Sequence, residues 1–292
     1  MIGKNYNFDG NTIPYTGAAA KTAKWLADFK IHTVATETPE LPRQDWHGAI
    51  TSPTYARGRL IPVNGEFFAA DKTQRTTPRQ EIEDIFKLPG FPDKTNEIKR
   101  LDFEDDDGTE WFIRCKVYQL PQFEHERGSP VGTFFLQLYA EDPFIRSKNP
   151  KTGTENYSLF GGVRLPEELP FAMNQYSNVL TVNNAGNYPS ATKITITGDI
   201  LNPKVLNLTT GRYFALNTDI TAGETLIIDS GQINTDPFAT INGVNALADR
   251  VSGSQWLFVN PGENKFVLLG DDYELGNDQK AEMTVEFYDV RL

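Results

Sequence analysis

Few side chains in this chain are of types and spacings that do chemistry. The densest group is the acidic run from Asp102 to Asp107, which ends at Gly108. If this glycine held the sixth position of an EF-hand loop, Phe103 would stand at the first ligand position and Arg114 at the twelfth, and neither supplies a carboxylate. We therefore interpret the run as the solvated tip of a hairpin and predict no metal site there.

The remaining candidates for metal binding or nucleophilic catalysis are isolated. Glu124, His125 and Glu126 follow Pro121 in a polar stretch, and the chain has only 3 histidines with which to complete a ligand set. Cys115 is the only cysteine, so no disulfide can form within the chain, which suits a reducing compartment. Its place on the inward face of a predicted strand argues against a nucleophile. No metal, cofactor or catalytic residue is predicted.

Motifs of the common enzyme classes are absent from the sequence. There is no G-x-S-x-G turn, Walker loop or G-x-G-x-x-G pattern, and Ser129 lies in GSPVG, where the third position is proline. We therefore predict that the protein is not an enzyme. Paired carboxylates for glycoside cleavage are brought together by the fold, so spacing does not exclude them, and a glycoside hydrolase stays an alternative.

The charge of the chain limits its partners. The net charge is −11 at pH 7, and no cluster of Lys and Arg is present to neutralise phosphates, which argues against nucleic-acid binding. The acidity serves solubility, or it forms a surface past which DNA moves without sticking. The start, MIGKNYNFDG, lacks the profile of a signal peptide, and no run approaches the roughly 18 apolar residues of a membrane helix. No membrane association is expected.

The elements that position these side chains are mostly strands. Residues 25–31 place Trp25, Phe29 and their alternate neighbours on one face, which favours a strand, although a helix from Ala18 is the other interpretation. The next apolar stretch, residues 56–71, is predicted to be a strand interrupted near Pro62 and Gly65 by a bulge or an edge, because proline cannot donate to the ladder.

One helix is predicted, from Pro78 to Leu88. Thr77 suits the N-cap, proline suits the first turn, and Gln80 suits a capping box. Gly90 and a proline two residues later would end it. The apolar stripe of this helix, which we assign to the core, consists of Ile82, Ile85 and Phe86.

A hairpin and a series of short strands follow the helix. The hairpin is expected to turn at Asp107-Gly108 and to bury one face of its second strand. After residue 170 short alternating runs recur, with turns predicted at Asn242-Gly243 and Pro261-Gly262, which is typical of a two-sheet sandwich. The predicted buried face of the hairpin consists of Trp111, Ile113, Cys115 and Val117.

The composition divides the chain into two domains. Residues 147–170 lose hydrophobic periodicity and are rich in Lys, Asn, Gly, Glu and Pro. We therefore predict an N-terminal domain over 1–146, a linker over 147–170 and a C-terminal β-sandwich domain over 171–292. The fold class is mainly β, with a β-rich (α+β) N-terminal domain that contains one helix.

Aromatic residues, 12% of the chain, keep a carbohydrate-binding, lectin-like module open as an alternative function. Trp111 and Trp256 lie within alternating strands and are assigned to the core. Only exposed, coplanar rings would stack on a sugar. The aromatic residues less constrained by the pattern are Trp25, Trp46, Tyr176, Tyr188 and Tyr213.

Several phrases of the sequence resemble those of one protein family. These phrases are LQLYAEDPF over 136–144, NNAGNYPSATKITITG over 183–198, LNPKVLNLTTG over 201–211, AGETLIID over 222–229 and NPGENKF over 260–266. In this order they are similar to the distal tail protein (Dit) family of siphophages. The first forty-five residues match poorly, so no family feature is transferred to them.

The resemblance implies a structural protein of a phage tail tip. Its N-terminal domain would form a hexameric ring that extends the tail tube, and its C-terminal domain would be a galectin-like or carbohydrate-module-like β-sandwich. The implied partners are the major tail protein, the tail-associated hub protein and receptor-binding proteins, with DNA only in transit through the lumen. The implied location is the virion tail tip, assembled in the bacterial host cytoplasm, and no cofactor is implied.

Overall fold

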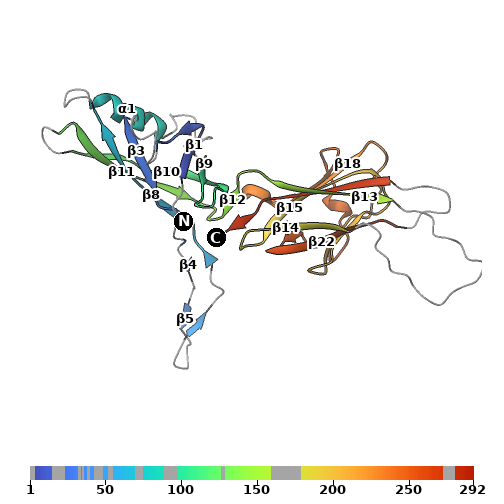
Figure 1. Ribbon diagram of the computed structural model, residues 1–292. Helices are drawn as coiled ribbons and strands as arrows, with labels where there is room; N and C mark the ends of the chain where they lie inside the picture. Colours follow the sequence, from blue (N-terminus) through green and yellow to red (C-terminus); the bar gives the residue numbers. More distant parts are fainter. Residues whose placement is uncertain are drawn as a thin grey trace, which may run out of the picture. The chain divides into compact units, whose positions relative to one another are not determined.

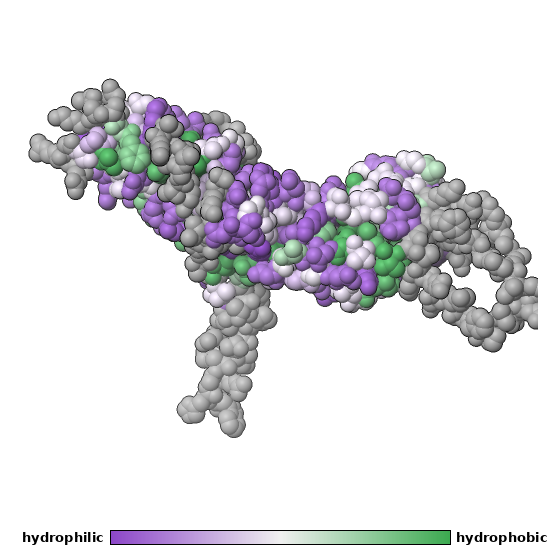
Figure 2. Space-filling view, viewed as in Figure 1, coloured by the Kyte–Doolittle hydropathy of each residue, from purple (hydrophilic) through white to green (hydrophobic). Residues whose placement is uncertain are grey.

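The computed structural model describes residues 4–14, 24–31, 34, 36–37, 40–42, 49–51, 55–69, 75–88, 98–125, 129–158, 179–271 and 280–292. The chain divides into two compact units, Met1–Lys148 with Leu292, and Asn149–Arg291 (Figure 1). Each unit has its own hydrophobic core. The predicted fold class, mainly β with one α-helix among the described residues, is confirmed. On the face shown in Figure 2, hydrophilic residues form much of the surface of both units.

The first unit is built on a curled antiparallel sheet. The sheet has the strand order β2-β1-β9-β10-β11-β8-β3, and β12 pairs with β10. Its strands are β1 (Lys4–Phe8), β2 (Asn11–Thr12), β3 (Trp25–Phe29), β8 (Arg59–Phe68), β9 (Lys99–Glu104), β10 (Glu110–Glu124), β11 (Val131–Ala140) and β12 (Ile145–Ser147).

Strand β10 changes partner along its length, which folds the sheet onto itself. Its first part, up to Cys115, pairs with β9, and its second part, from Lys116, pairs with β11. The register with β11 shifts twice, between Val117 and Gln119 and between Gln119 and Gln122, and such irregularities increase the local twist. Residues of both halves therefore share one core.

Between β3 and β8 the chain forms two short two-stranded ladders, which together we call the arm (Figure 1). Strand β4 (Thr36–Glu37) pairs with β7 (Tyr55–Ala56), and β5 (Glu40–Pro42) pairs with β6 (Ala49–Thr51). Glu37 is exposed and forms an ion pair with Arg57. The sequence pattern does not predict this element.

The strand predicted over residues 25–31 is confirmed as β3. Trp25, Ala27 and Phe29 are buried while the residues between them are half-buried. The predicted inward face of the hairpin is also confirmed, since Trp111, Ile113 and their alternate neighbours on β10 are buried. Period-two alternation is a dependable guide here because one side of each strand meets the core.

The helix α1 (Thr76–Ile85) lies close to its predicted position, but its ends differ. Arg75, not Thr77, is the N-cap residue, and no side chain caps the helix, so the predicted capping box is wrong. Pro78 is tolerated two positions further in, as the third helical residue, because the first four amides of a helix have no intrahelical partner. The helix ends before Leu88, where the Phe86 amide donates to the Ile82 carbonyl at 3.1 Å. Gly90 lies outside the described residues.

The apolar stripe of α1 is confirmed. Ile82 and Phe86 are fully buried, and Ile85 packs against the same core. The Phe86 ring stacks on Phe8 with centroids 5.2 Å apart, which ties the helix to β1.

The bulge or edge predicted near Pro62 is wrong. Strand β8 runs without a register shift along β11, and it lies between β11 and β3. The Pro62 carbonyl accepts a hydrogen bond from the Lys30 amide at 2.9 Å. In an antiparallel ladder the amide and the carbonyl of one residue point toward the same neighbouring strand. The position where Pro62 lacks an amide hydrogen therefore faces the chain just after Phe29, where β3 ends. Proline therefore costs the ladder little at this position.

The hairpin between β9 and β10 exists, but its two-residue turn is replaced by a longer loop, Asp105–Thr109. The Asp105 amide donates to the Thr109 carbonyl at 2.9 Å, and Gly108 has φ of +82°. The Asp107 carboxylate accepts a hydrogen bond from the Thr109 amide at 2.9 Å. The acidic run thus satisfies the amides of its own loop, as expected for a hairpin tip.

The second unit is the predicted two-sheet sandwich. One sheet has the order β13-β23-β15-β18-β19-β20, with β21 on β15, and the other has the order β14-β22-β16-β17. Its elements are β13 (Lys151–Ser158), β14 (Leu180–Asn184), β15 (Ser190–Asp199), β16 (Lys204–Asn207), β17 (Arg212–Ala215), β18 (Thr225–Asp229), η2 (Gln232–Asn234), β19 (Phe238–Ile241), β20 (Val244–Asn245), η3 (Leu247–Asp249), β21 (Phe258–Val259), β22 (Gly262–Leu269), β23 (Lys280–Phe287) and β24 (Val290–Arg291).

Local features of the sandwich follow the sequence pattern, with one exception. Ile194 and Ile196 on β15 are buried, and Asn242 and Gly243 have φ of 50° and 81°, as a tight hairpin turn requires. The exception is the start of the predicted linker 147–170, where β13 pairs along its whole length with β23. Its polar, glycine-containing sequence hides the strand, because β13 lies at the edge of the sheet order and buries little. Residues 159–178 lie outside the described residues.

We expect Ile196→Ala to destabilise the second unit by about 2–5 kcal/mol, because it removes a fully buried side chain and leaves a cavity in the sandwich core. Urea denaturation followed by circular dichroism measures the change. The matched control is Thr195→Ala on the opposite face of β15, which should cost less than about 1 kcal/mol. Equal losses for the two variants would contradict the assigned orientation of β15.

Candidate functional site

The side chains that the sequence offered for chemistry do not converge in the structure. Cys115 is 1% exposed, and burial raises the pKa of its thiol, so it is an inert core residue as predicted. Glu124 and His125 are exposed at the end of β10, and Glu126 lies outside the described residues. Among the described residues, no group of three His, Cys, Asp or Glu side chains could hold a metal ion.

The aromatic residues of the sandwich make contacts with the chain itself. Trp256 is half-buried and stacks on Phe214 with centroids 5.1 Å apart, and the Arg250 guanidinium lies 5.1 Å from the Trp256 ring centroid. The Lys204 ammonium lies 4.5 Å from the Tyr213 ring centroid. These cations take up ring surface on which a sugar would stack.

The other rings named in the sequence analysis are scattered over the chain. Trp25 and Trp111 are buried in the first unit, and Tyr188 is 40% exposed in the second. Trp46 and Tyr176 lie outside the described residues. The described rings give no support to a coplanar sugar platform.

A groove of about 680 Å³ lies on the first unit, across β3, β8, β11 and β10. It is formed on the side of these strands that faces away from the core. Its lining residues are Leu26, Ala27, Asp28, Asn64, Gly65, Glu66, Gln122, Glu124, Thr133, Phe134 and Phe135.

Strand register brings these distant residues into two rows. Neighbouring residues in a row lie directly opposite one another on paired strands, so their side chains share one face. The first row crosses the sheet through Gln122, Phe135, Asn64 and Asp28. The second row, two residues further along, consists of Glu124, Thr133, Glu66 and Leu26.

Gly65 allows the sheet to curve at the groove. A Cβ atom at this position would lie 2.2 Å from the Phe134 ring and 2.3 Å from the Leu26 carbonyl oxygen. Only glycine permits this close approach of ring and backbone. The sequence showed this glycine as an irregularity, but the partners that require it come from other strands.

The groove is acidic. Asp28 pairs with Lys30 at 2.6 Å on the same strand, whereas no described cation forms an ion pair with Glu66 or Glu124. Carboxylates on a concave surface reinforce one another's field, so the groove attracts cations and repels phosphate groups.

Apolar side chains extend the same face beyond the groove. Leu60 on β8 is 47% exposed, Tyr118 on β10 is 65% exposed, and Val131 on β11 is 40% exposed. Leu60 lies opposite Tyr139, whose ring is 6.1 Å from that of Tyr118. Several exposed apolar side chains on one sheet face are characteristic of a surface that contacts other proteins. We call this surface, with the groove, the outer face of the first unit.

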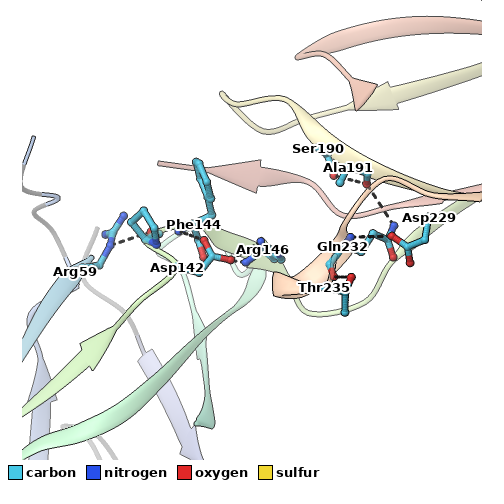
Figure 3. A network of polar contacts seen from close by, with 10 residues as sticks. Arg59, Asp142, Phe144, Arg146, Ser190, Ala191, Asp229, Gln232 and Thr235 are labelled. Carbon is cyan, nitrogen blue, oxygen red and sulfur yellow. Dashed lines mark hydrogen bonds and ion pairs between the residues drawn. The ribbon is translucent and has the colours of Figure 1, made fainter. Parts of the chain in front are cut away.

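The phrase LQLYAEDPF ends in a buried ion pair that fixes a turn (Figure 3). Asp142 and Arg146 pair at 2.6 Å, with side chains 7% and 11% exposed. The Asp142 carboxylate also accepts the Phe144 amide at 3.1 Å. This aspartate therefore organises the turn between β11 and β12.

A second polar network fixes the turn after β18 in the second unit (Figure 3). The Asp229 carboxylate accepts the amides of Gly231 and Gln232 at 2.8 and 2.9 Å. The Gln232 side chain then donates to the carbonyls of Ala191 and Glu286, at 3.3 and 2.9 Å. The network joins three strands of one sheet and explains the acidic end of the phrase AGETLIID.

Comparisons with known proteins agree with this architecture. Residues 185–287 match the family model of the siphovirus-type tail component, C-terminal domain. The whole chain is similar in fold to the crystal structure of the SPP1 Dit (gp 19.1) protein, described as a paradigm of the hub adsorption apparatus in phages that infect Gram-positive bacteria. That alignment has a TM-score of 0.64 and 11% identity and covers 99% of each chain.

A second structural match is the baseplate of phage P2 in its activated conformation with Ca, with a TM-score of 0.40, 9% identity and 91% of each chain covered. A search of curated proteins found no match. No helix among the described residues has the length and apolar character needed to cross a membrane.

The match to the C-terminal domain of siphovirus-type tail components lies within the second compact unit. The fold of the entire chain is similar to that of SPP1 Dit, so the resemblance seen in the sequence is confirmed.

We expect Cys115 in the folded protein to resist alkylation by iodoacetamide even at pH 9. Burial excludes the reagent and raises the thiol pKa, so the thiol stays protonated at pH values where an exposed cysteine is largely a thiolate. Mass spectrometry measures the labelled fraction with time, and the same protein in denaturant is the control. Rapid labelling of the folded protein would contradict the burial of Cys115 on β10.

Proposed function

We propose that this chain is a distal tail protein whose copies form a hexameric ring between the phage tail tube and the baseplate hub. The observation that carries the proposal is the similarity of fold to SPP1 Dit along 99% of both chains, with the family match over 185–287. The proposed partners are the major tail protein, the tail-associated hub protein and receptor-binding proteins. The ring is assembled in the host cytoplasm and then resides in the virion.

The first unit has the surfaces that a ring requires. A closed ring of identical subunits joins two unlike surfaces of neighbouring copies. Strand β3 ends the strand order of the described sheet, and an edge strand offers backbone groups for pairing with a neighbour. The exposed apolar residues of the outer face provide a second surface that association would bury.

The acidic groove supports the passage of DNA through the ring. Because Glu66 and Glu124 lack cationic partners among the described residues, a lumen lined by six copies of the groove would repel the DNA backbone. Repulsion keeps the polymer from adhering while it moves. The role of the chain is structural, and the proposal assigns no catalytic residue.

We expect the purified protein, alone or with its tail-tube and hub partners, to form rings with an open centre. Negative-stain microscopy shows the ring, and native mass spectrometry gives the number of copies. A protein that stays monomeric with both partners present would contradict the proposal. Binding to glycan arrays or hydrolysis of cell-wall polysaccharides by that monomer would favour the lectin or the glycosidase alternative.

We also expect the double variant Glu66→Lys and Glu124→Lys to bind duplex DNA at least about tenfold more tightly than the wild-type ring at low salt, with the gain lost as salt rises. Fluorescence anisotropy with a short duplex measures the affinity. The control reverses two charges on β23 of the second unit, Glu282→Lys and Glu286→Lys. Equal DNA affinity of the two double variants would show that the groove does not face the lumen.

A further inference from the structure

Arg59 is a buried cation that meets no carboxylate among the described residues. Its side chain is 2% exposed, its Nε atom donates to the Pro143 carbonyl at 3.2 Å, and its Nη1 atom donates to the Ile31 carbonyl. Its Nη2 atom is buried and has no hydrogen-bond partner. Burial of a charged group without a counter-ion is unfavourable, so this position requires a specific reason for an arginine.

The two carbonyls belong to segments that are separated along the chain but meet at the root of the arm. Ile31 follows β3 and precedes the arm, and Arg59 is the first residue of β8, directly after the arm. Pro143 lies in the turn between β11 and β12. One guanidinium therefore joins the entry of the arm, its exit and a turn of the sheet, and Figure 3 shows its hydrogen bond to the turn.

The turn that Arg59 holds is itself fixed. The ion pair between Asp142 and Arg146 and the hydrogen bond from the Phe144 amide to Asp142 hold the residues on both sides of Pro143. The Pro143 carbonyl is thus a stationary acceptor, against which the root of the arm can be aligned.

The described strands of the arm form no ladder with the curled sheet. They pair only with one another, and Thr36 and Glu37 of β4 are exposed. An isolated two-stranded ladder is marginally stable in water, so its orientation is set where it joins the sheet.

We propose that Arg59 is a positioning residue that locks the root of the arm to the Ala140–Phe144 turn and so gives the arm the same direction in every copy. The functional consequence rests on the proposed ring, because a closed ring requires identical geometry from each subunit. Arginine is needed because its planar fork reaches two carbonyls at once, whereas lysine offers a point charge on a flexible stem.

The test compares full-length wild type, Arg59→Lys, Arg59→Gln and the control Arg57→Lys, which changes an exposed arginine of the Glu37 ion pair. Hydrogen exchange with mass spectrometry is expected to show about tenfold or faster exchange in both Arg59 variants at residues 28–31, 55–60 and 141–146. Exchange in β9 and in the second unit should stay at the wild-type rate. The control should match wild type throughout.

Ring assembly provides the functional readout. In the presence of the tail-tube and hub partners, we expect Arg57→Lys to form rings as wild type does and Arg59→Lys to lose most of its rings while its far-ultraviolet circular dichroism is unchanged. If Arg59→Lys does not fold, the neutral Arg59→Gln variant still tests the proposal. In the wild type, we expect the amides at the root to be the most strongly protected of the arm, and weaker protection there would contradict the proposal.

The outcomes separate this inference from the proposed function. Wild-type exchange rates at the arm root in both Arg59 variants, or normal ring assembly by them, would overturn the role of Arg59. Absence of rings in wild type would overturn the proposed ring, while the exchange measurement would still report whether Arg59 locks the root.

Discussion

The first unit depends on one strand that pairs with two different neighbours. β10 joins β9 along its first part and β11 along its second, so a single continuous backbone connects both halves of the curled sheet. Its alternate residues, from Trp111 to Val117, fill the core between those halves. Since side chains on a strand point alternately to opposite faces, the same strand must present the intervening residues outward. The core of the unit and its outer face thus follow from one pairing pattern.

The outer face and the arm root show how this sheet can serve assembly. Strand register collects Asp28, Glu66 and Glu124 into a groove, although they lie on three strands far apart in the chain. At the arm root, Arg59 joins the arm to the buried turn that Asp142 stabilises. Both sites lie in the first unit, where the proposed ring would be formed, whereas the family match lies in the second unit.

Much of the fold was predictable where one face of an element meets the core. The alternation in β3, β10 and β15 and the stripe of Ile82 and Phe86 gave strands and a helix that the structure confirms. Predictions failed where tertiary context decides. Pro62 suggested an edge, but its missing donor falls past the end of β3. The N-cap of α1 is Arg75 and not the predicted Thr77. A proline is compatible with several positions in the first turn, so it does not define the first helical residue. The polar strand β13 was expected as linker because it buries little.

The sequence by itself determined the mainly β class, the core face of each long strand, the single inert cysteine and the likeness to the distal tail family. These properties depend on local periodicity, composition and order along the chain, which need no knowledge of strand partners. Only the tertiary structure decided which carboxylates share the groove, how the arm pairs and which carbonyls Arg59 reaches. Each of those depends on register between strands distant in sequence, and a shift of one residue would turn every side chain of a strand to the opposite face.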